Sequence, residues 1–217
     1  MTYRITALKT QKHNRQRVNI YLDGGYAFGL ARIVAAWLKV GQEISEDHIA
    51  RMHDEDDRET AYQRAIKYIN YRPHSENEIR QYLKTRVVFE DNIERVIERL
   101  KHAEFINDSR FAKDWVENRS DFRPRSKHAL AYELKRRGIQ QDIIDSTLEN
   151  IDETKLAYKA AQKQARKTKT TEWEIFRKKM FGHLARCGFN YATCAQVVEQ
   201  IWADQNNTNQ ENSERIY

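Results

Sequence analysis

Residues that interrupt helices are scarce in this chain of 217 residues, which contains only 2 prolines and 7 glycines. Proline and glycine are the residues that destabilise a helix interior most, so their scarcity favours long helices. No apolar run reaches the length of a signal peptide or of a membrane-spanning helix. We therefore expect a mainly helical, cytoplasmic protein with no membrane partner.

Cysteine is equally scarce, and the common catalytic and metal-binding motifs are missing. The two cysteines, Cys187 and Cys194, complete no ligand set, because no further cysteine or clustered histidine accompanies them. Cys194 falls at an apolar position of its helix, which predicts a small buried side chain. The sequence has no glycine-rich phosphate loop, HExxH pair or nucleophile elbow. We expect no enzyme activity, no metal and no cofactor.

Charged residues are abundant. They make up 32% of the chain, against 40% hydrophobic residues, and 38 lysines and arginines outnumber 32 acidic residues. The net charge of +6 and the pI near 9.2 favour an anionic partner. Basic residues that only keep a protein in solution give the same composition, so both interpretations stay open. The high charge also favours an elongated molecule with much solvated surface.

Apolar residues recur with a period near 50 residues, and Gly138 and Gly188 share that register. The central positions Leu134, Ile139, Ile144, Leu148 and Ile151 are matched upstream by Leu83, Val88, Ile93, Ile97 and Leu100, and downstream by Leu184, Phe189, Cys194, Val198 and Ile201. Steps of three and four residues indicate helices, and this period indicates stacked helical units. We predict three tandem three-helix repeats. Each covers its neighbour's apolar face, because a unit of roughly 45 residues buries too little surface alone.

A small antiparallel β-meander is predicted before the repeats. Residues 3–9 and 17–22 alternate apolar and polar side chains, and the turn pair Asp23-Gly24 leads to a third short run at 26–30. Three short strands are marginal alone, so a helix must cover one face. We assign this helix to residues 31–40. The side chains expected to face the sheet are Ile33, Val34, Trp37 and Leu38.

The predicted domain limits follow from these patterns. Residues 1–58 comprise the meander, its helix and an acidic linker, because residues 46–59 hold seven acids against two bases and indicate a solvated linker or helix entry. The repeats occupy 59–106, 107–151 and 152–203. Residues 204–217 form a polar tail, for which we expect disorder or a frayed helix end.

Short polar motifs predict where several helices begin, because side-chain oxygens at these positions can accept hydrogen bonds from free helix amides. The predicted caps are Ser45, Asp91, Asp142 and the capping boxes Ser75–Glu78 and Thr171–Glu174.

Basic residues concentrate in the second and third repeats. Arg123-Pro124-Arg125 stands at a helix entrance, where guanidinium groups and unpaired helix amides together suit phosphate or carboxylate. Surface arginines that cover apolar side chains explain the same motif equally well. Lysines recur every four residues at 155, 159, 163 and 167, which aligns them as a stripe on one side of a helix. Such like charges repel one another, so the stripe costs stability unless an anion neutralises it.

These basic residues are the predicted contacts for an anionic partner. They are Arg119, Arg123, Arg125, Lys127, Arg136, Arg137, Lys155, Lys159, Lys163, Arg166, Lys167, Lys169, Arg177, Lys178 and Lys179. A solvated face without a partner remains the other interpretation of the stripe. Among the aromatic residues, Trp115 is expected in the core, whereas Tyr132 and Trp173 are expected to be exposed.

Two segments resemble a known family. FINDSRFAKDWVENR (105–119), followed by ELKRRGI (133–139), resembles the central signature of the RecX family of bacterial RecA regulators. AIKYINYRPHSENEIRQYLKTR (65–86) resembles the Tyr-Leu, Arg, Ser and Glu-Leu pattern of that family. The resemblance covers about residues 60–203 and extends to the amino-terminal strands, which occur in some members. The family usually has a glycine where this chain has Val87, so the turn there is expected to differ.

The resemblance implies a curved array of three three-helix units that lies in the helical groove of the RecA filament on DNA. It implies contact with adjacent RecA subunits, lower RecA ATPase and strand-exchange activities in recombination and DNA repair, and no catalytic residues. The expected partners are the RecA filament and single- and double-stranded DNA, bound by a monomer. The alternative is a stand-alone DNA-binding protein whose helix pair at 130–151 enters the major groove as a helix-turn-helix.

Overall fold

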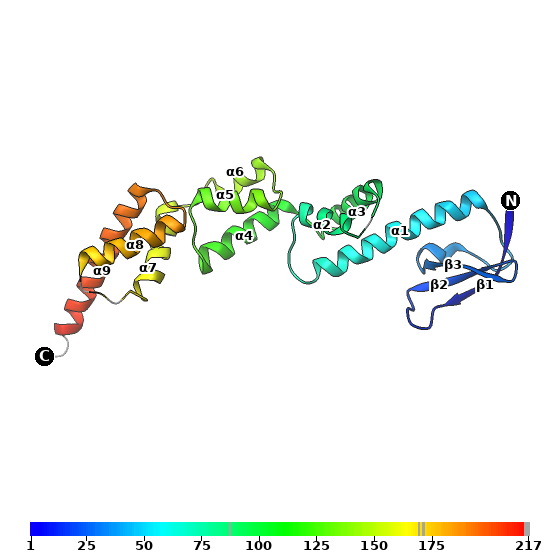
Figure 1. Cartoon of the computed structure of the whole chain (residues 1–217), viewed down its shortest axis with the longest axis horizontal. Helices are drawn as coiled ribbons and strands as arrows, with labels where there is room; N and C mark the ends of the chain where they lie inside the picture. The colour runs from blue at the N-terminus through cyan, green and yellow to red at the C-terminus, as the bar shows by residue number, and fades with distance from the viewer. Residues whose placement is uncertain (87, 169, 171, 215–217) are drawn as a thin grey trace. The chain divides into compact units, whose positions relative to one another are not determined.

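The computed structural model describes residues 1–86, 88–168, 170 and 172–214. The chain forms two compact units, Met1–Asn107 and Asp108–Tyr217, here called unit 1 and unit 2. Unit 1 contains a small antiparallel sheet followed by helices, and unit 2 is helical (Figure 1). The predicted class, a mainly helical protein with a small antiparallel sheet before its repeats, is confirmed.

The sheet contains one more strand than predicted. Its strands are β1 (Thr2–Thr10), β2 (Arg17–Leu22), β3 (Gly25–Ala31) and β4 (Glu43–Ser45), in the antiparallel order β3-β2-β1-β4. The first three confirm the meander, with Asp23 and Gly24 at φ angles of 48° and 88° in the turn between β2 and β3. β4, which pairs with β1, is too short to show an alternating pattern.

Residues 31–40 do not form the predicted covering helix. Only Val34–Trp37 is helical, as a short 3-10 helix. Leu38 packs in the sheet core, but Ile33 is 59% exposed and Trp37 is 86% exposed. These two side chains therefore do not face the sheet. The prediction is wrong because another helix takes that place.

The helix that covers the sheet is α1 (Glu46–Ile69), which contacts β3 and β4. Figure 1 shows it running from the sheet toward the next helices of unit 1. Ser45 caps it as predicted, because the Ser45 hydroxyl accepts a hydrogen bond from the His48 amide at 3.3 Å. Met52, on the sheet side of α1, is buried in the sheet core.

The acidic residues at 46–59 lie in the first part of this continuous helix, which agrees with the predicted helix entry and not with a linker. Two of them, Asp56 and Glu59, are only 7% exposed, which contradicts a fully solvated face. The Asp56 carboxylate lies 2.8 Å from the guanidinium group of Arg17 of β2, and the Glu59 carboxylate lies 2.7 Å from the guanidinium group of Arg99. A buried carboxylate needs such a partner. Both arginines are distant in sequence, so no local pattern reveals these pairs.

The tandem three-helix repeats are confirmed. The helices after α1 are α2 (Glu76–Lys84), α3 (Glu90–His102), α4 (Asp108–Phe122), α5 (Lys127–Arg136), α6 (Gln141–Leu148), α7 (Glu153–Ala165), α8 (Trp173–Arg186) and α9 (Tyr191–Glu214). The later part of α1 joins α2 and α3 in repeat 1; α4 to α6 form repeat 2, and α7 to α9 form repeat 3. Gly138 and Gly188 follow α5 and α8 with φ angles of 79° and 90°, so the two turns are equivalent. The limits given for the domains stay a prediction.

The predicted helix caps are correct only in part. Ser75 and Glu78 form the expected capping box of α2. The N-caps of α3 and α6 make no side-chain hydrogen bond, and Asp91 and Asp142 lie in the first turns of these helices. The prediction that these two aspartates act as caps is wrong. A negative charge in the first turn still interacts favourably with the helix dipole.

Three positions that carried predictions lie outside the described residues, namely Val87, Lys169 and Thr171. The N-cap of α8 is Glu172, which makes no side-chain hydrogen bond. Trp173 is partly buried against Trp202, with ring centroids 5.4 Å apart, so its predicted exposure is wrong. The last helix, α9, extends to Glu214 and includes much of the predicted polar tail.

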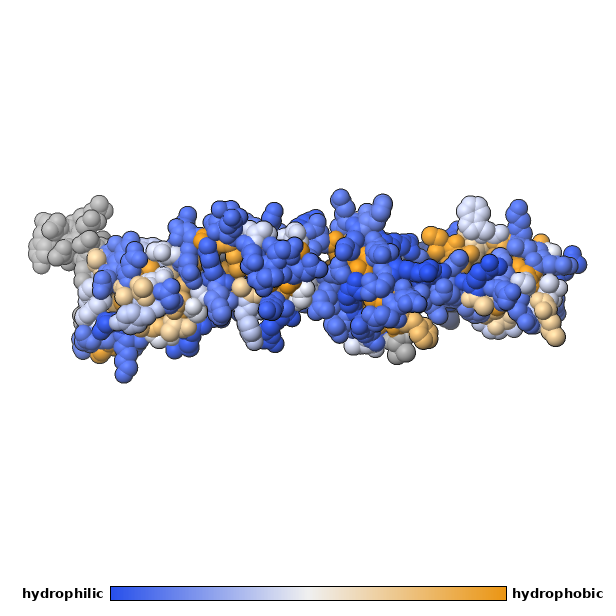
Figure 2. Space-filling view, turned by 90° about the horizontal axis from the view of Figure 1, so that it is seen from above, coloured by the Kyte–Doolittle hydropathy of each residue, from blue (hydrophilic) through white to orange (hydrophobic). Residues whose placement is uncertain are grey.

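Buried apolar side chains of the described residues form separate clusters. One lies between the sheet and α1, a second lies inside repeat 1, and a third is shared by repeats 2 and 3. On the face drawn in Figure 2, hydrophilic residues cover most of the surface and hydrophobic residues show as separate patches. None of the helices in the described part of the chain combines the length and apolarity that a bilayer crossing requires.

Candidate functional site

The candidate site lies in unit 2, where all the predicted binding residues belong. Repeats 2 and 3 share one core there, with Leu130, Leu134, Phe176 and Leu184 fully buried. This packing fixes the helices that carry the basic side chains. The structure divides these side chains into three groups, which are engaged in internal contacts, gathered around a pocket or exposed on the surface.

Arg119 and Arg137 are engaged with Trp115 of α4. Their guanidinium carbons lie 4.4 Å and 3.8 Å from the centre of a Trp115 ring. The Trp115 indole donates a hydrogen bond to Glu133 at 2.9 Å, and Arg119 lies 2.7 Å from the same carboxylate. Trp115 is partly buried against the core, as the sequence predicts. These contacts stabilise the packing of α4 on α5, so the two arginines are less available to a partner.

Two lysines of the stripe contact the same residue inside the protein. Lys155, Lys159 and Lys163 belong to α7, and Lys167 follows the end of that helix at Ala165. The Lys159 ammonium lies 3.2 Å from the Asp121 carboxylate of α4, and the Lys163 ammonium donates to the main-chain carbonyl of Asp121. The Asp121 carboxylate therefore neutralises Lys159, whereas Lys163 keeps its charge because a main-chain carbonyl is not an anion. Asp121 is distant in sequence from α7, and only the packing of repeat 2 on repeat 3 brings it there.

Three amides at the start of α5 are engaged, which counts against the interpretation that Arg123 and Arg125 act together with unpaired helix amides. The Ser126 amide donates to the Cys187 carbonyl at 3.1 Å, and the Lys127 amide donates to Glu153 at 3.2 Å. The Ala129 amide donates to the Ser126 hydroxyl at 3.1 Å. Repeat 3 supplies two of these acceptors. These three amides are therefore not available to an anion.

A pocket of about 220 Å³ lies at the seam between repeats 2 and 3. We call it the basic pocket. It is lined by Phe122, Arg123, Pro124, Arg125, Ala160, Lys163, Gln164, Lys167, His183 and Cys187. Four of these residues are lysine or arginine and none is acidic. The structure thus brings four of the predicted residues together from the α4–α5 connection and from α7 and the segment after it.

Two uncharged groups, His183 and Cys187, also line the basic pocket. Burial lowers the pKa of His183, and the nearby charges of Arg186, Arg125 and Lys167 lower it further. Burial raises the pKa of the Cys187 thiol, which lies 3.7 Å from the His183 ring nitrogen. His183 is therefore a neutral hydrogen-bonding group near pH 7. Sequence reasoning did not identify it as a site residue, because only the fold brings it close to Arg125 and Lys167.

The remaining predicted residues are dispersed over unit 2. Lys127 donates to the Glu149 carbonyl at 3.1 Å, Arg136 lies 5.9 Å from the ring centre of the exposed Tyr132, and Arg177 lies 5.5 Å from that of Phe181. Lys155, Arg166, Lys178 and Lys179 are exposed and make no ion pair with the described residues. Lys169 is outside those residues. The exposed group supplies surface charge outside the pocket.

Nothing in the described part of the chain resembles a metal centre, since it contains no group of three or more His, Cys, Asp or Glu side chains arranged to hold an ion. Both cysteines are free and buried. Cys194 is 1% exposed within the core of repeats 2 and 3, which confirms its predicted role as a small buried side chain. Burial also raises the pKa of its thiol, so it remains protonated and unreactive.

Three family descriptions match successive parts of the chain. The regulatory protein RecX N-terminal domain matches residues 3–45, the first three-helix domain of RecX matches residues 61–100, and the second three-helix domain of RecX matches residues 107–148. The first match coincides with the sheet, and the other two coincide with repeats 1 and 2.

Curated relatives and a solved structure are similar along almost the whole chain. Regulatory protein RecX of Clostridium beijerinckii is 30% identical over 207 residues, which cover 92% of this chain and 96% of the relative. Regulatory protein RecX of Bacillus subtilis is 28% identical over 218 residues, which cover 98% of this chain and 83% of the relative. A crystal structure of regulatory protein RecX is 26% identical, with a TM-score of 0.73 and coverage of 91% of this chain and 99% of that one.

Proposed function

Because this chain belongs to the RecX family of regulatory proteins, we propose that it binds the RecA filament on DNA and lowers RecA's ATPase and strand-exchange activities. The role is one of binding, without catalysis by this chain. Family membership is the observation that carries the proposal. The similarity to the family includes the runs at 65–86, 105–119 and 133–139 and extends over nearly the whole chain.

The charge of repeats 2 and 3 supports a polyanionic or acidic partner. Lys155, Arg166, Lys178 and Lys179 are exposed and have no ion pair with the described residues, and four further cations surround the basic pocket. Cations that are free of internal partners attract phosphates or carboxylates and release counterions when they bind them. Binding that depends on these residues should therefore weaken as salt is added.

The charges on α6 count against the alternative of a stand-alone helix-turn-helix protein. In that arrangement the second helix of the pair α5–α6 enters the major groove. The sequence of α6, QDIIDSTL, has two aspartates and no basic residue. Asp142 and Asp145 would approach a strongly negative duplex. The basic residues belong mainly to the other helices, which favours backbone or protein contacts over base readout by α6.

The test is RecA-catalysed ATP hydrolysis on single-stranded DNA, measured with increasing amounts of the purified chain. We expect slower hydrolysis at equal or lower molar ratios to RecA, and weaker inhibition at higher salt. Unchanged hydrolysis at low salt contradicts the proposal. Binding to random duplex oligonucleotides at fixed salt tests the alternative, which requires strong preference for one sequence.

A further inference from the structure

The basic pocket has an excess of positive charge that the described part of the chain does not neutralise. Its four cations are Arg123, Arg125, Lys163 and Lys167, and no acid lines it. The neighbouring carboxylate of Asp121 is paired with Lys159, on the same stripe. Bringing four like charges to one cavity is unfavourable without a counter-charge. The fold nevertheless holds them there.

We propose that the basic pocket binds a single phosphate group, held by Arg123, Arg125, Lys163 and Lys167. This inference goes beyond the proposed function and does not depend on binding to RecA. Guanidinium groups offer planar pairs of N–H donors to phosphate oxygens, and lysine offers a compact charge. The pocket provides both types of donor from two repeats.

Two of these side chains are already held in place. The Arg125 guanidinium donates one hydrogen bond to the main-chain carbonyl of Arg186 at 2.8 Å, which leaves its other N–H groups free to bind an anion. The Lys163 ammonium donates to the Asp121 carbonyl and keeps further donors. Neither acceptor carries a full charge, so these contacts orient the cations without neutralising them. Preorganised donors of this kind bind an anion with a smaller loss of conformational entropy.

His183 provides a built-in reporter of phosphate binding. The groups that face it are Arg125 from the α4–α5 connection, Lys167 from the segment after α7, and Arg186 and Cys187 from the end of α8 and its C-cap. The cations among them disfavour the imidazolium. A phosphate bound among the same cations offsets their field, so it should raise the pKa of His183. By linkage, phosphate then binds more tightly as the pH falls through that pKa, as long as the phosphate keeps its charge.

The experiment is an NMR titration of the full chain with inorganic phosphate at constant ionic strength, balanced with chloride. We expect saturable shifts of the His183 ring signals and a higher His183 pKa with phosphate than with chloride alone. The test variant is Arg123→Gln combined with Lys167→Gln. It should bind phosphate at least about tenfold more weakly, because two charge-assisted contacts are lost.

The matched control is Lys155→Gln combined with Lys178→Gln, which removes the same charge from exposed positions outside the pocket lining. The control should keep the wild-type affinity. Shifts that grow linearly without saturation, or equal affinities in the two double variants, overturn the proposal. Native spectra of both variants, recorded without phosphate, confirm that neither change unfolds unit 2.

Short thymidine oligonucleotides with and without a 5′-phosphate distinguish the sources of the phosphate. If both oligonucleotides shift the His183 signals in a saturable way, the pocket accepts a backbone phosphodiester. If only the 5′-phosphorylated one does so, the pocket selects a phosphate monoester. Both results support the proposal, whereas failure of phosphate and of both oligonucleotides contradicts it. If the test variant binds phosphate more weakly but inhibits RecA as strongly as the wild type does, phosphate binding at the pocket is not required for RecA inhibition. That result leaves the proposal of a phosphate site intact.

Discussion

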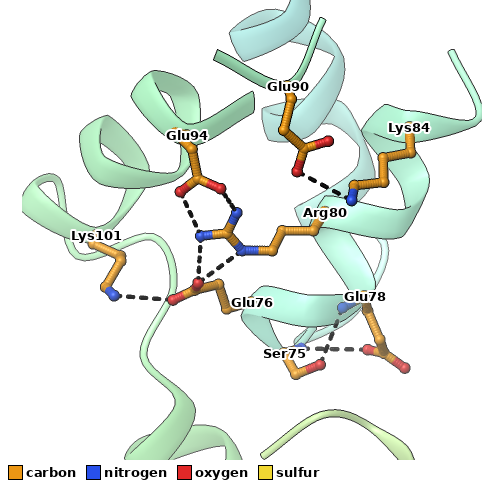
Figure 3. A network of polar contacts seen from close by, with 8 residues as sticks. All are labelled: Ser75, Glu76, Glu78, Arg80, Lys84, Glu90, Glu94 and Lys101. Carbon is orange, nitrogen blue, oxygen red and sulfur yellow. Dashed lines mark hydrogen bonds and ion pairs between the residues drawn. The ribbon is translucent and has the colours of Figure 1, made fainter. Parts of the chain in front are cut away.

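Repeat 1 and the pair formed by repeats 2 and 3 use their basic residues in different ways. In repeat 1, Arg80 of α2 lies between Glu76 of the same helix, at 2.8 Å, and Glu94 of α3 (Figure 3). Lys101 joins the network through Glu76 at 2.9 Å. Hydrogen bonding to Glu94 raises the pKa of Arg80. In repeats 2 and 3, several cations instead line the basic pocket or extend into solvent.

The difference arises at equivalent positions of the repeats. Ser75 and Ser126 are the N-caps of α2 and α5, and each hydroxyl accepts a hydrogen bond from an amide three residues later. In the register set by these serines, Lys127 takes the place of Glu76, and Ala131 takes the place of Arg80. Repeat 2 therefore cannot form this network. Repeat 2 has the same capped helix start as repeat 1. Its basic side chains are left to make contacts across the seam with repeat 3 or with a partner.

The largest expected effect is a loss of stability when the packing of repeat 3 on repeat 2 is disturbed. Gly188 has a φ of +90°, and an added Cβ would lie 2.6 Å from the Ser126 hydroxyl and 3.0 Å from Ala129. Gly188→Ala should lower the free energy of unfolding by about 3 kcal/mol, because a clash adds to the cost of a left-handed residue. Urea denaturation, followed by circular dichroism, measures the loss.

The matched control for this change is Gly24→Ala in unit 1. Gly24 has a similar φ of +88°, with nothing within 4 Å of the added Cβ. Its replacement should cost only about 1 kcal/mol, the conformational part of the effect. Equal losses for the two variants would show that repeats 2 and 3 are not packed together as tightly as the contact at Ser126 indicates.

The next effect concerns binding. Replacing Lys163, Lys167, Lys178 and Lys179 together by alanine should weaken binding to DNA and to the RecA filament roughly 100-fold and flatten its salt dependence. The reason is that these cations release counterions when they meet an anionic partner. Fluorescence anisotropy over a salt series, with labelled DNA alone and with RecA filaments, measures both quantities.

Four exposed cations of unit 1 provide the control with the same loss of charge. They are Arg51, Arg64, Lys67 and Arg95. Their replacement by alanine should change binding little if the partner contacts repeats 2 and 3. A loss as large as that of the lysine variant would mean that total charge matters and its position does not.

Local signals in the sequence predicted much of the fold. The Ser45 cap, the Ser75–Glu78 capping box and the glycines at 138 and 188 depend on neighbours in the chain, and all are found as predicted. Local signals failed at Asp91 and Asp142, which lie in the first helical turns and are not caps. The larger errors involve distant contacts. Residues 31–40 resemble an amphipathic helix, yet α1 takes the position on the sheet for which they were assigned.

The candidate site follows the same division. Composition identified Arg123, Arg125, Lys163 and Lys167 as basic residues of interest, but it did not show that they line one pocket. Their convergence depends on how α7 and α8 pack on the α4–α5 connection. Asp121 and His183 were not predicted as site residues for this reason, since their importance comes only from the groups that they contact across the seam.

The smallest expected effect is the response of the repeat 1 network to acid. Hydrogen bonding to Arg80 lowers the pKa of Glu94. Burial raises the pKa of Glu76, but Lys101 and Arg80 outweigh this and lower it. A carboxyl group whose folded pKa is depressed contributes stability above its unfolded pKa, about 4.3 for glutamate, and loses it as the pH falls through the folded pKa. The contribution should therefore be present near neutral pH and lost below about pH 4.

Arg80→Gln should remove most of this dependence, because both carboxylates lose their shared cation. The measurement is the urea midpoint of the wild type and the variant from neutral pH to pH values below the glutamate range. Their difference should shrink steadily on acidification. Arg64→Gln is the control, since Arg64 is exposed on α1 and has no ion pair with the described residues. If the Arg64 variant shows the same pH-dependent difference, the network of repeat 1 stabilises no more than general surface charge does. In that case the contrast between the repeats would concern binding alone.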